Sequence, residues 1–99
     1  MLLGLSVLRG RREFAFDSAL WQEAEHLRPR MVRDLLDRNE LVGMSRQDVN
    51  RMLGRPEGRD SVYNGNYSYW AGTDGVIDDM WLEIDFQDDI VTATRYVPD

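Results

Sequence analysis

The sequence has no cysteine and only one histidine among its 99 residues. The absence of cysteine excludes disulfide bonds, thiolate metal sites, cysteine nucleophiles and a lipidated cysteine within this chain. His26 alone cannot form the zinc sites that need two or three histidines. Glycine-rich phosphate-binding motifs and the G-x-S-x-G motif of hydrolases are also missing. We therefore expect no catalytic residue, no cofactor and no bound metal.

Basic residues are scarce in the second part of the chain. The 12 basic and 18 acidic residues give a net charge of −6. Residues 60–99 contain nine acidic residues and one basic residue, Arg95. An acidic surface repels phosphate backbones, because nucleic-acid affinity comes from cations that release condensed counterions. We therefore expect no nucleic-acid partner.

The sequence also lacks a long apolar run. The apolar stretch in residues 1–10 is shorter than the roughly 20 residues of a membrane span, and it lacks the basic start of a signal peptide. We interpret residues 1–16 as an N-terminal arm, either disordered or the remnant of a signal peptide. The periplasm or cell envelope is expected if a signal peptide was removed, and the cytoplasm otherwise. Residues 17–99 are predicted to form one domain without membrane insertion.

Residues 17–38 have the apolar spacing of helix. Asp17 is placed to cap the first amides, and Phe16 is placed to pack against Trp21 as a hydrophobic staple. Pro29 lacks an amide hydrogen and clashes with the preceding turn. The helix therefore either breaks near this proline or restarts with the proline in its first turn.

A second, shorter helix is predicted over residues 46–53. Ser45, with Asp48 three residues later, forms a capping box at its start. Gly54 can adopt the left-handed conformation that ends a helix, and Pro56 prevents continuation.

The last forty residues are rich in β-branched and aromatic side chains and predict three strands. We place these at residues 67–71, 80–86 and 91–97, with a tight turn at 87–89. Strands joined by short loops pair antiparallel. The predicted fold is α+β: two N-terminal helices, the first interrupted near Pro29, pack on one face of a three-stranded antiparallel sheet.

Alternation along the strands predicts which side chains leave the core. Leu82 faces the helices, so Trp81 points to the opposite, open face. We expect Val91 and Val97 to face the core, which would place Tyr96 on the open face. Aromatic anchors with a charged rim are typical of protein interfaces. In the first strand, either Trp70 or its neighbours Tyr67 and Tyr69 also lie on the open face. The expected partner-binding residues are Tyr67, Tyr69, Trp70, Trp81, Glu83, Asp85, Arg95 and Tyr96.

Several segments occur in the order and spacing of a known family. They are residues 34–36 (DLL), 41–49 (LVGMSRQDV) and 52–56 (MLGRP), followed by a Tyr/Trp-rich strand and residues 82–86 (LEIDF). Together these segments resemble the SmpA/OmlA (BamE-like) modules, which share a fold with β-lactamase inhibitory protein domains. The resemblance covers residues 21–97 and implies two helices on one face of a three-stranded antiparallel sheet. The chain departs from the lipoprotein pattern because it lacks the cysteine.

The resemblance also implies classes of function. Known members are bacterial envelope lipoproteins that scaffold outer-membrane assembly, or secreted inhibitors that clamp an enzyme. We expect a non-enzymatic, bacterial interaction module that presents its open sheet face to a protein partner, which can be a second copy of the chain. The alternative is an acidic inhibitor or immunity-like protein that occupies the basic cleft of an enzyme. An N-terminal arm folded over the open face would remove this site.

Two further groups of residues have a simpler interpretation. His26 has no nucleophile or orienting acid at a catalytic spacing. Aspartates in the loops could hold calcium, but their spacing matches no EF-hand, and solvated turn acids that keep hairpins soluble explain them. These aspartates are Asp74, Asp78, Asp79, Asp88 and Asp89.

Overall fold

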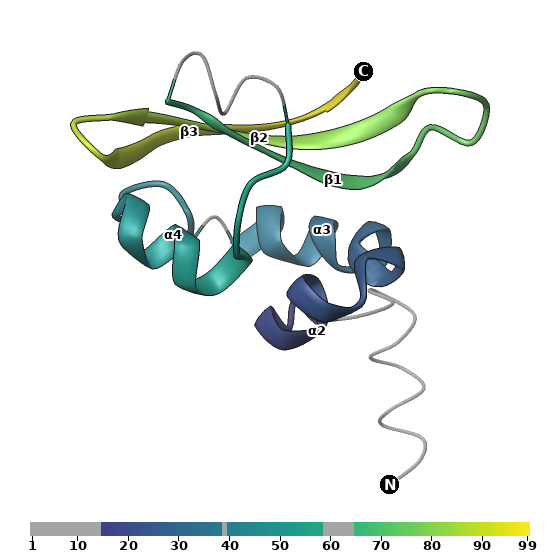
Figure 1. Cartoon of the computed structure of the whole chain (residues 1–99), viewed down its shortest axis with the longest axis horizontal. Helices are drawn as coiled ribbons and strands as arrows, with labels where there is room; N and C mark the ends of the chain where they lie inside the picture. The colour runs from purple at the N-terminus through teal and green to yellow at the C-terminus, as the bar shows by residue number, and fades with distance from the viewer. Residues whose placement is uncertain (1–14, 39, 59–64) are drawn as a thin grey trace, which may run out of the picture.

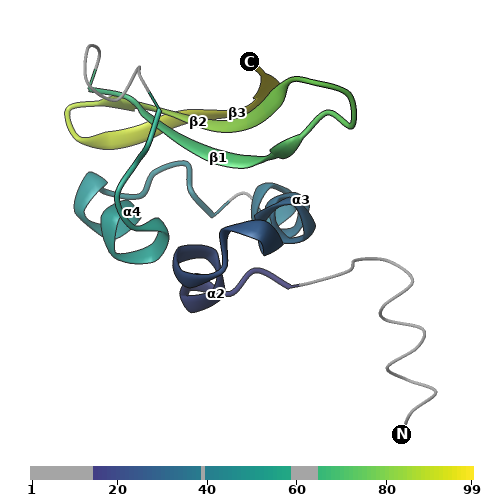
Figure 2. The same cartoon turned by 45° about the vertical axis from the view of Figure 1, so that its right-hand side comes forward.

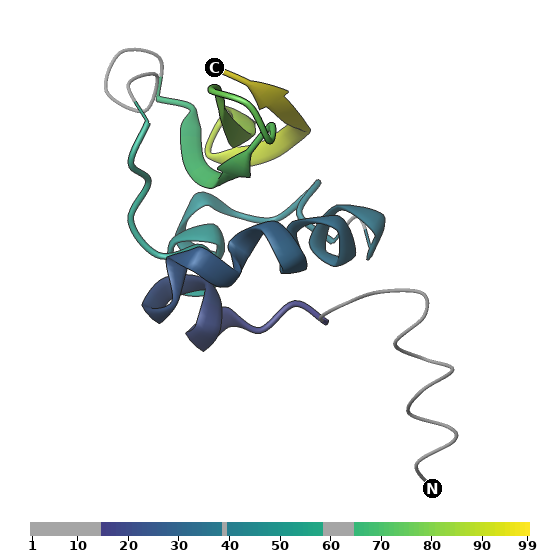
Figure 3. The ribbon, with the colours of Figure 1, turned by 90° about the vertical axis from the view of Figure 1, so that its right-hand side faces the viewer.

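The computed structural model describes residues 15–38, 40–58 and 65–99. The helical elements are α2 (Ser18–Glu23), a short 3-10 helix η1 (Glu25–Leu27), α3 (Arg28–Arg38) and α4 (Arg46–Leu53). The strands are β1 (Tyr67–Thr73), β2 (Asp79–Gln87) and β3 (Ile90–Pro98), and they form one antiparallel sheet in the order β1-β2-β3. The labelled helices all lie on one side of this sheet (Figures 1 and 3). The predicted α+β layout is confirmed.

The helices begin and end where the sequence predicts. The Asp17 carboxylate accepts a hydrogen bond of 2.9 Å from the amide three residues later, and Ser45 caps α4 in the same way at 3.1 Å. Pro29 lies in the first turn of α3, where a missing amide hydrogen costs nothing. Gly54 ends α4 with a φ of +80°. Of the two alternatives at the proline, the restart with Pro29 in the first turn is confirmed, and α2 has already ended at Glu23.

The core lies between the helices and the sheet. The largest fully buried side chains come from every strand, from α2, α3 and α4 and from the segment between α3 and α4: Trp21, Met31, Leu35, Leu41, Val49, Leu53, Tyr69, Leu82, Ile84 and Val91. The ring centroids of Trp21 and Tyr69 lie 6.3 Å apart in an edge contact, which joins α2 to β1. Burial of apolar area at about 25 cal/mol per Å² makes this layer the main source of stability.

Arg28 is a buried cation that ties the helices to β1. Its Nε donates to the Trp21 carbonyl oxygen at 2.7 Å, and its Nη1 donates to the Trp70 carbonyl oxygen at 3.1 Å. The same Nη1 lies 3.1 Å from the Glu57 carboxylate. Because the guanidinium holds both β1 and the chain that precedes it, residue 57 is fixed beside the sheet.

The β2–β3 turn has the predicted tight geometry. Asp88 and Asp89 have φ values of +53° and +63°, which is the conformation of a two-residue type I′ hairpin. Arg46, at the start of α4, donates from Nε to the Asp89 carboxylate at 2.7 Å, and its guanidinium lies 4.0 Å from the ring centre of Phe86. This contact joins the turn to the helical layer.

A bulge reverses the alternation that the sequence predicts for β3. Val91 pairs with Phe86, but Ala93 pairs with Asp85, so Thr92 is an extra residue in β3. An extra residue moves every later side chain to the other face of the sheet. Val91 therefore faces the helices, as predicted, while the residues from position 93 onward alternate in the opposite sense.

Candidate functional site

The open face of the sheet, opposite the helices, is the candidate site (Figure 2). At its centre Trp70 in β1 is paired directly with Trp81 in β2, and Trp81 is paired with Val97 in β3. Both indole side chains are partly exposed. The Trp70 Nε1 donates to the Asp79 carboxylate at 3.1 Å. The Trp81 Nε1 is covered and has no acceptor among the described residues. The two indoles form a partly apolar centre on a face that no described helix covers.

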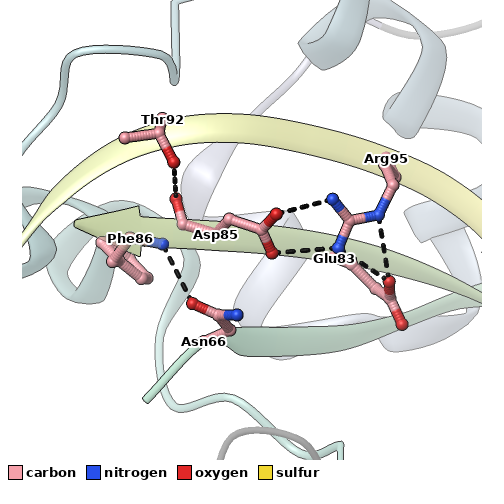
Figure 4. Close-up of polar contacts among 6 residues, drawn as sticks. All are labelled: Asn66, Glu83, Asp85, Phe86, Thr92 and Arg95. Atoms are coloured by element: carbon pink, nitrogen blue, oxygen red, sulfur yellow. Dashed lines mark hydrogen bonds and ion pairs between the residues drawn. The ribbon is translucent and has the colours of Figure 1, made fainter. Parts of the chain in front are cut away.

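A charged cluster lies next to the indoles. Arg95 in β3 reaches Glu83 and Asp85 in β2 at the same time (Figure 4). Its Nη1 lies 2.6 Å from Asp85 Oδ2, and its Nη2 lies 3.1 Å from Glu83 Oε1. The guanidinium donates hydrogen bonds to the Asp85 carboxylate and so holds the pKa of that carboxyl below its ordinary value. Two carboxylates thus fix the guanidinium of Arg95 in one orientation on the open face.

A cavity of about 400 Å³ opens on the same face. Its lining combines one indole, three carboxylates, a hydroxyl and backbone of small residues: Glu57, Gly58, Ser68, Trp81, Glu83, Pro98 and Asp99. No basic residue lines it in the described part of the chain. The cavity is therefore acidic with an aromatic wall.

One wall of this cavity is the segment that follows α4. The amides of Glu57 and Gly58 both donate to the Ser68 carbonyl oxygen, at 2.9 and 3.0 Å. The Glu57 carboxylate accepts from the Trp70 amide at 3.0 Å. A Cβ at Gly58 would lie 2.1 Å from the Cβ of Ser68, so only glycine allows this approach. The segment covers part of the β1 edge, and nothing in the sequence pattern predicted this contact.

The structure brings five of the eight predicted partner residues together on the open face. Their pairing in the sheet fixes this placement, because partners across strands share a face and alternate with buried Leu82 and Ile84. The five residues are Trp70, Trp81, Glu83, Asp85 and Arg95.

The assignment of Tyr67 and Tyr69 as partner-binding residues was wrong, because Trp70 is the aromatic residue of β1 that lies on the open face. Tyr69 pairs with Leu82 on the helix side, is fully buried and donates from its hydroxyl to the Gly54 carbonyl oxygen at 2.8 Å. Burial raises the pKa of its hydroxyl. Tyr67 also lies on the helix side, with its ring centre 4.8 Å from that of Phe86. Their alternation with Trp70 sends both rings toward the helices.

The placement of Tyr96 on the open face was also wrong. Tyr96 pairs with Leu82 and so faces the helix side, at the edge of the sheet. Its hydroxyl donates to the Ala71 carbonyl oxygen at 2.8 Å, and it is 37 % exposed. The bulge at Thr92 causes the error, since it moves Val97 to the open face and Tyr96 to the other one.

Sequence reasoning missed an exposed apolar pair at the β1–β2 hairpin tip. Val76 and Ile77 are 82 % and 85 % exposed. Asp74 fixes the tip, because its Oδ1 accepts from the amides of Val76 and Asp78 at 2.8 and 3.2 Å. The only sequence signal is a Val-Ile pair inside an Asp/Gly-rich loop. Two adjacent apolar side chains in such exposure form a small apolar patch at the hairpin tip.

The described residues offer no sign of other site types. His26 is exposed in η1. In the part of the chain that the structure covers, no three histidine or acidic side chains are arranged to hold a metal ion, and no helix has the length and apolarity to cross a membrane. Most of the N-terminal arm, residues 1–14, lies outside the described residues, so the alternative in which this arm covers the open face is not tested.

Comparisons of the chain with protein-family models, curated proteins and solved structures found no match. The fold therefore stands on the structure itself, and the resemblance to the SmpA/OmlA (BamE-like) family stays a prediction.

Proposed function

We propose that this chain is a non-enzymatic interaction module that binds a protein partner through the open face of its sheet. The observation that carries the proposal is the cross-strand pair of Trp70 and Trp81, which alternate with residues buried under the helices and therefore lie on the opposite face. Large aromatic side chains that are partly exposed at the centre of a surface are the usual energetic anchors of interfaces. Their partial burial means that little side-chain entropy is lost on binding.

The charged cluster supports the same proposal. Arg95 is already held by Glu83 and Asp85 in the free protein. A charged rim of this kind sets orientation and association rate more than affinity. The family resemblance adds support, because its implied functions are envelope scaffolding and enzyme inhibition, and both require a protein interface. A scaffold associated with the cell envelope is the version that we propose.

Site-specific photo-crosslinking tests the proposal. A benzoylphenylalanine replaces Ala93 on the open face in one variant and exposed Gln47 on α4 in a matched control. We expect a defined partner, or a second copy of the chain, to crosslink from position 93 and not from position 47. The purified complex should weaken at least about tenfold with Trp81→Ala, the loss of one aromatic anchor.

Two results would contradict the proposal. One is crosslinking that occurs from position 47 alone. The other is a complex whose dissociation constant is unchanged by Trp81→Ala, although circular dichroism shows that the variant is folded.

The alternative function, an acidic inhibitor of an enzyme with a basic cleft, has its own supporting observation. Both hairpins of the sheet end in exposed acids, Asp74 and Asp78 at one end and Asp88 and Asp89 at the other. An enzyme with a basic cleft would meet these tips before the indoles. The two functions differ in how strongly the dissociation constant depends on salt concentration.

A further inference from the structure

The cavity on the open face has a chemistry that selects one kind of partner group. Trp81 forms an aromatic wall, and Glu57, Glu83 and Asp99 contribute carboxylates. Its volume of about 400 Å³ falls in the range of sites that hold small ligand groups.

The walls of the cavity are fixed before any partner binds. Ser68 and Glu83 are directly paired across β1 and β2, and Gly58 is hydrogen-bonded to Ser68. At the other end the Asp99 amide donates to the Asp79 carbonyl oxygen at 2.8 Å, which continues the pairing of β2 with β3. A group that enters the cavity therefore meets a surface whose backbone is already ordered, which reduces the entropy cost of binding.

Among the described residues, basic side chains balance the negative charge of the lining only in part. Glu57 is paired with Arg28, and Glu83 is paired with Arg95, but neither arginine lines the cavity. Asp99 adds a further carboxylate. The space itself is therefore bordered by acceptors and an indole and favours a cation.

We propose that the cavity binds an arginine side chain of the partner protein, and this proposal rests on the proposed function. A guanidinium stacks on an indole by cation–π attraction and donates several hydrogen bonds to carboxylates. Trp81 supplies the stacking surface, and Glu83 and Asp99 supply acceptors. A lysine ammonium is a more strongly hydrated point charge with three donors, so it fits a flat aromatic wall beside carboxylates less well.

A titration with two matched peptides tests this inference on the purified chain. The probe is acetyl-Gly-Arg-Gly-amide, and the control replaces arginine with citrulline, which has the same shape without the charge. The Trp81 indole N–H signal is followed by ¹H–¹⁵N NMR. We expect a saturable shift with the arginine peptide and binding at least about tenfold weaker with the citrulline peptide, as the loss of one desolvated cation–π contact implies.

Two variants with the same charge change locate the site. Asp99→Asn removes a lining carboxylate, whereas Asp88→Asn removes an exposed carboxylate at the distant β2–β3 turn. Both side chains are exposed, so neither change should unfold the protein. We expect Asp99→Asn to weaken binding of the arginine peptide about threefold or more and Asp88→Asn to leave it within error.

Three outcomes would overturn the inference. The citrulline peptide could bind as well as the arginine peptide, or the two variants could weaken binding equally. The third outcome concerns Arg59, which follows Gly58 in the sequence. If the arginine peptide binds the Arg59→Ala variant and does not bind the unchanged chain, the cavity is assigned to this chain's own arginine. The crosslinking experiment reads the whole complex, so failure of the titration alone rejects the arginine site and leaves the proposed function standing.

Discussion

At the scale of single residues, adjacent positions on β2 have opposite roles. Leu82 is fully buried under the helices, whereas Trp81 is partly exposed on the open face. A one-residue difference in sequence thus separates a side chain that holds the fold together from one that is available to a partner.

This contrast predicts opposite effects of two alanine substitutions. Leu82→Ala should lower the free energy of unfolding by about 2–5 kcal/mol, because it leaves a cavity in the core. Trp81→Ala should lower the free energy of unfolding by less than Leu82→Ala does, and its main effect should be weaker partner binding. Urea unfolding of both variants, with equal m-values, measures the first effect. A larger loss of stability for Trp81→Ala than for Leu82→Ala would mean that Trp81 is a core residue.

Single residues also show which side chains could be assigned to the correct face of the sheet from the sequence. Trp81, Glu83 and Asp85 were placed correctly, because β2 keeps strict alternation from Met80 to Phe86. Tyr96 was misplaced because the bulge at Thr92 carries no glycine or other marker in the sequence. A bulge is set by the pairing of two strands, and local propensity does not reveal it.

At the scale of elements, local chemistry determines the helices more than the sheet. The boundaries of α4 follow from Ser45 and Gly54, two residues whose conformations are encoded nearby. The segment at Glu57 and Gly58 that covers the β1 edge could not be predicted, because its hydrogen bonds go to Ser68, which is distant in sequence. The cavity depends on that segment and was missed for the same reason.

The cap of α4 gives a prediction at this scale. Ser45→Ala removes the side-chain acceptor for the Asp48 amide and should cost about 1 kcal/mol of stability. Ser45→Asp keeps an acceptor at the same position and serves as the matched control. Thermal unfolding followed by circular dichroism measures both. Equal loss in the two variants would show that packing of Ser45 matters and that its cap does not.

At the scale of the whole molecule, the helices close the core and the sheet presents the open face. The helices cover one face of the sheet and leave the other face open (Figure 2). The two indoles, the charged cluster and the acidic cavity belong to this open face. The net charge of −6 favours partners with basic surfaces, but long-range charge mainly affects the rate of association.

Salt dependence separates the proposed function from the alternative one. An interface centred on Trp70 and Trp81 should change its dissociation constant by less than about threefold between 0.05 and 0.5 M salt, because its main contacts are apolar. A single arginine in the cavity adds little to this salt dependence. An inhibitor that docks its acidic hairpin tips in a basic cleft should weaken by more than about tenfold. Isothermal calorimetry of the purified complex at both concentrations decides between them.

The three tryptophans provide the most direct test of the open face as the binding surface. Trp70 and Trp81 lie on that face, and Trp21 in α2 is fully buried in the core, so the chain contains its own control. The partner identified by crosslinking is purified and added to the ¹⁵N-labelled chain, and the indole N–H signals are recorded during the titration. We expect the Trp70 and Trp81 signals to shift or broaden while the Trp21 signal stays in place. A shift of Trp21 and the α3 amides, with Trp70 and Trp81 unchanged, would contradict this expectation.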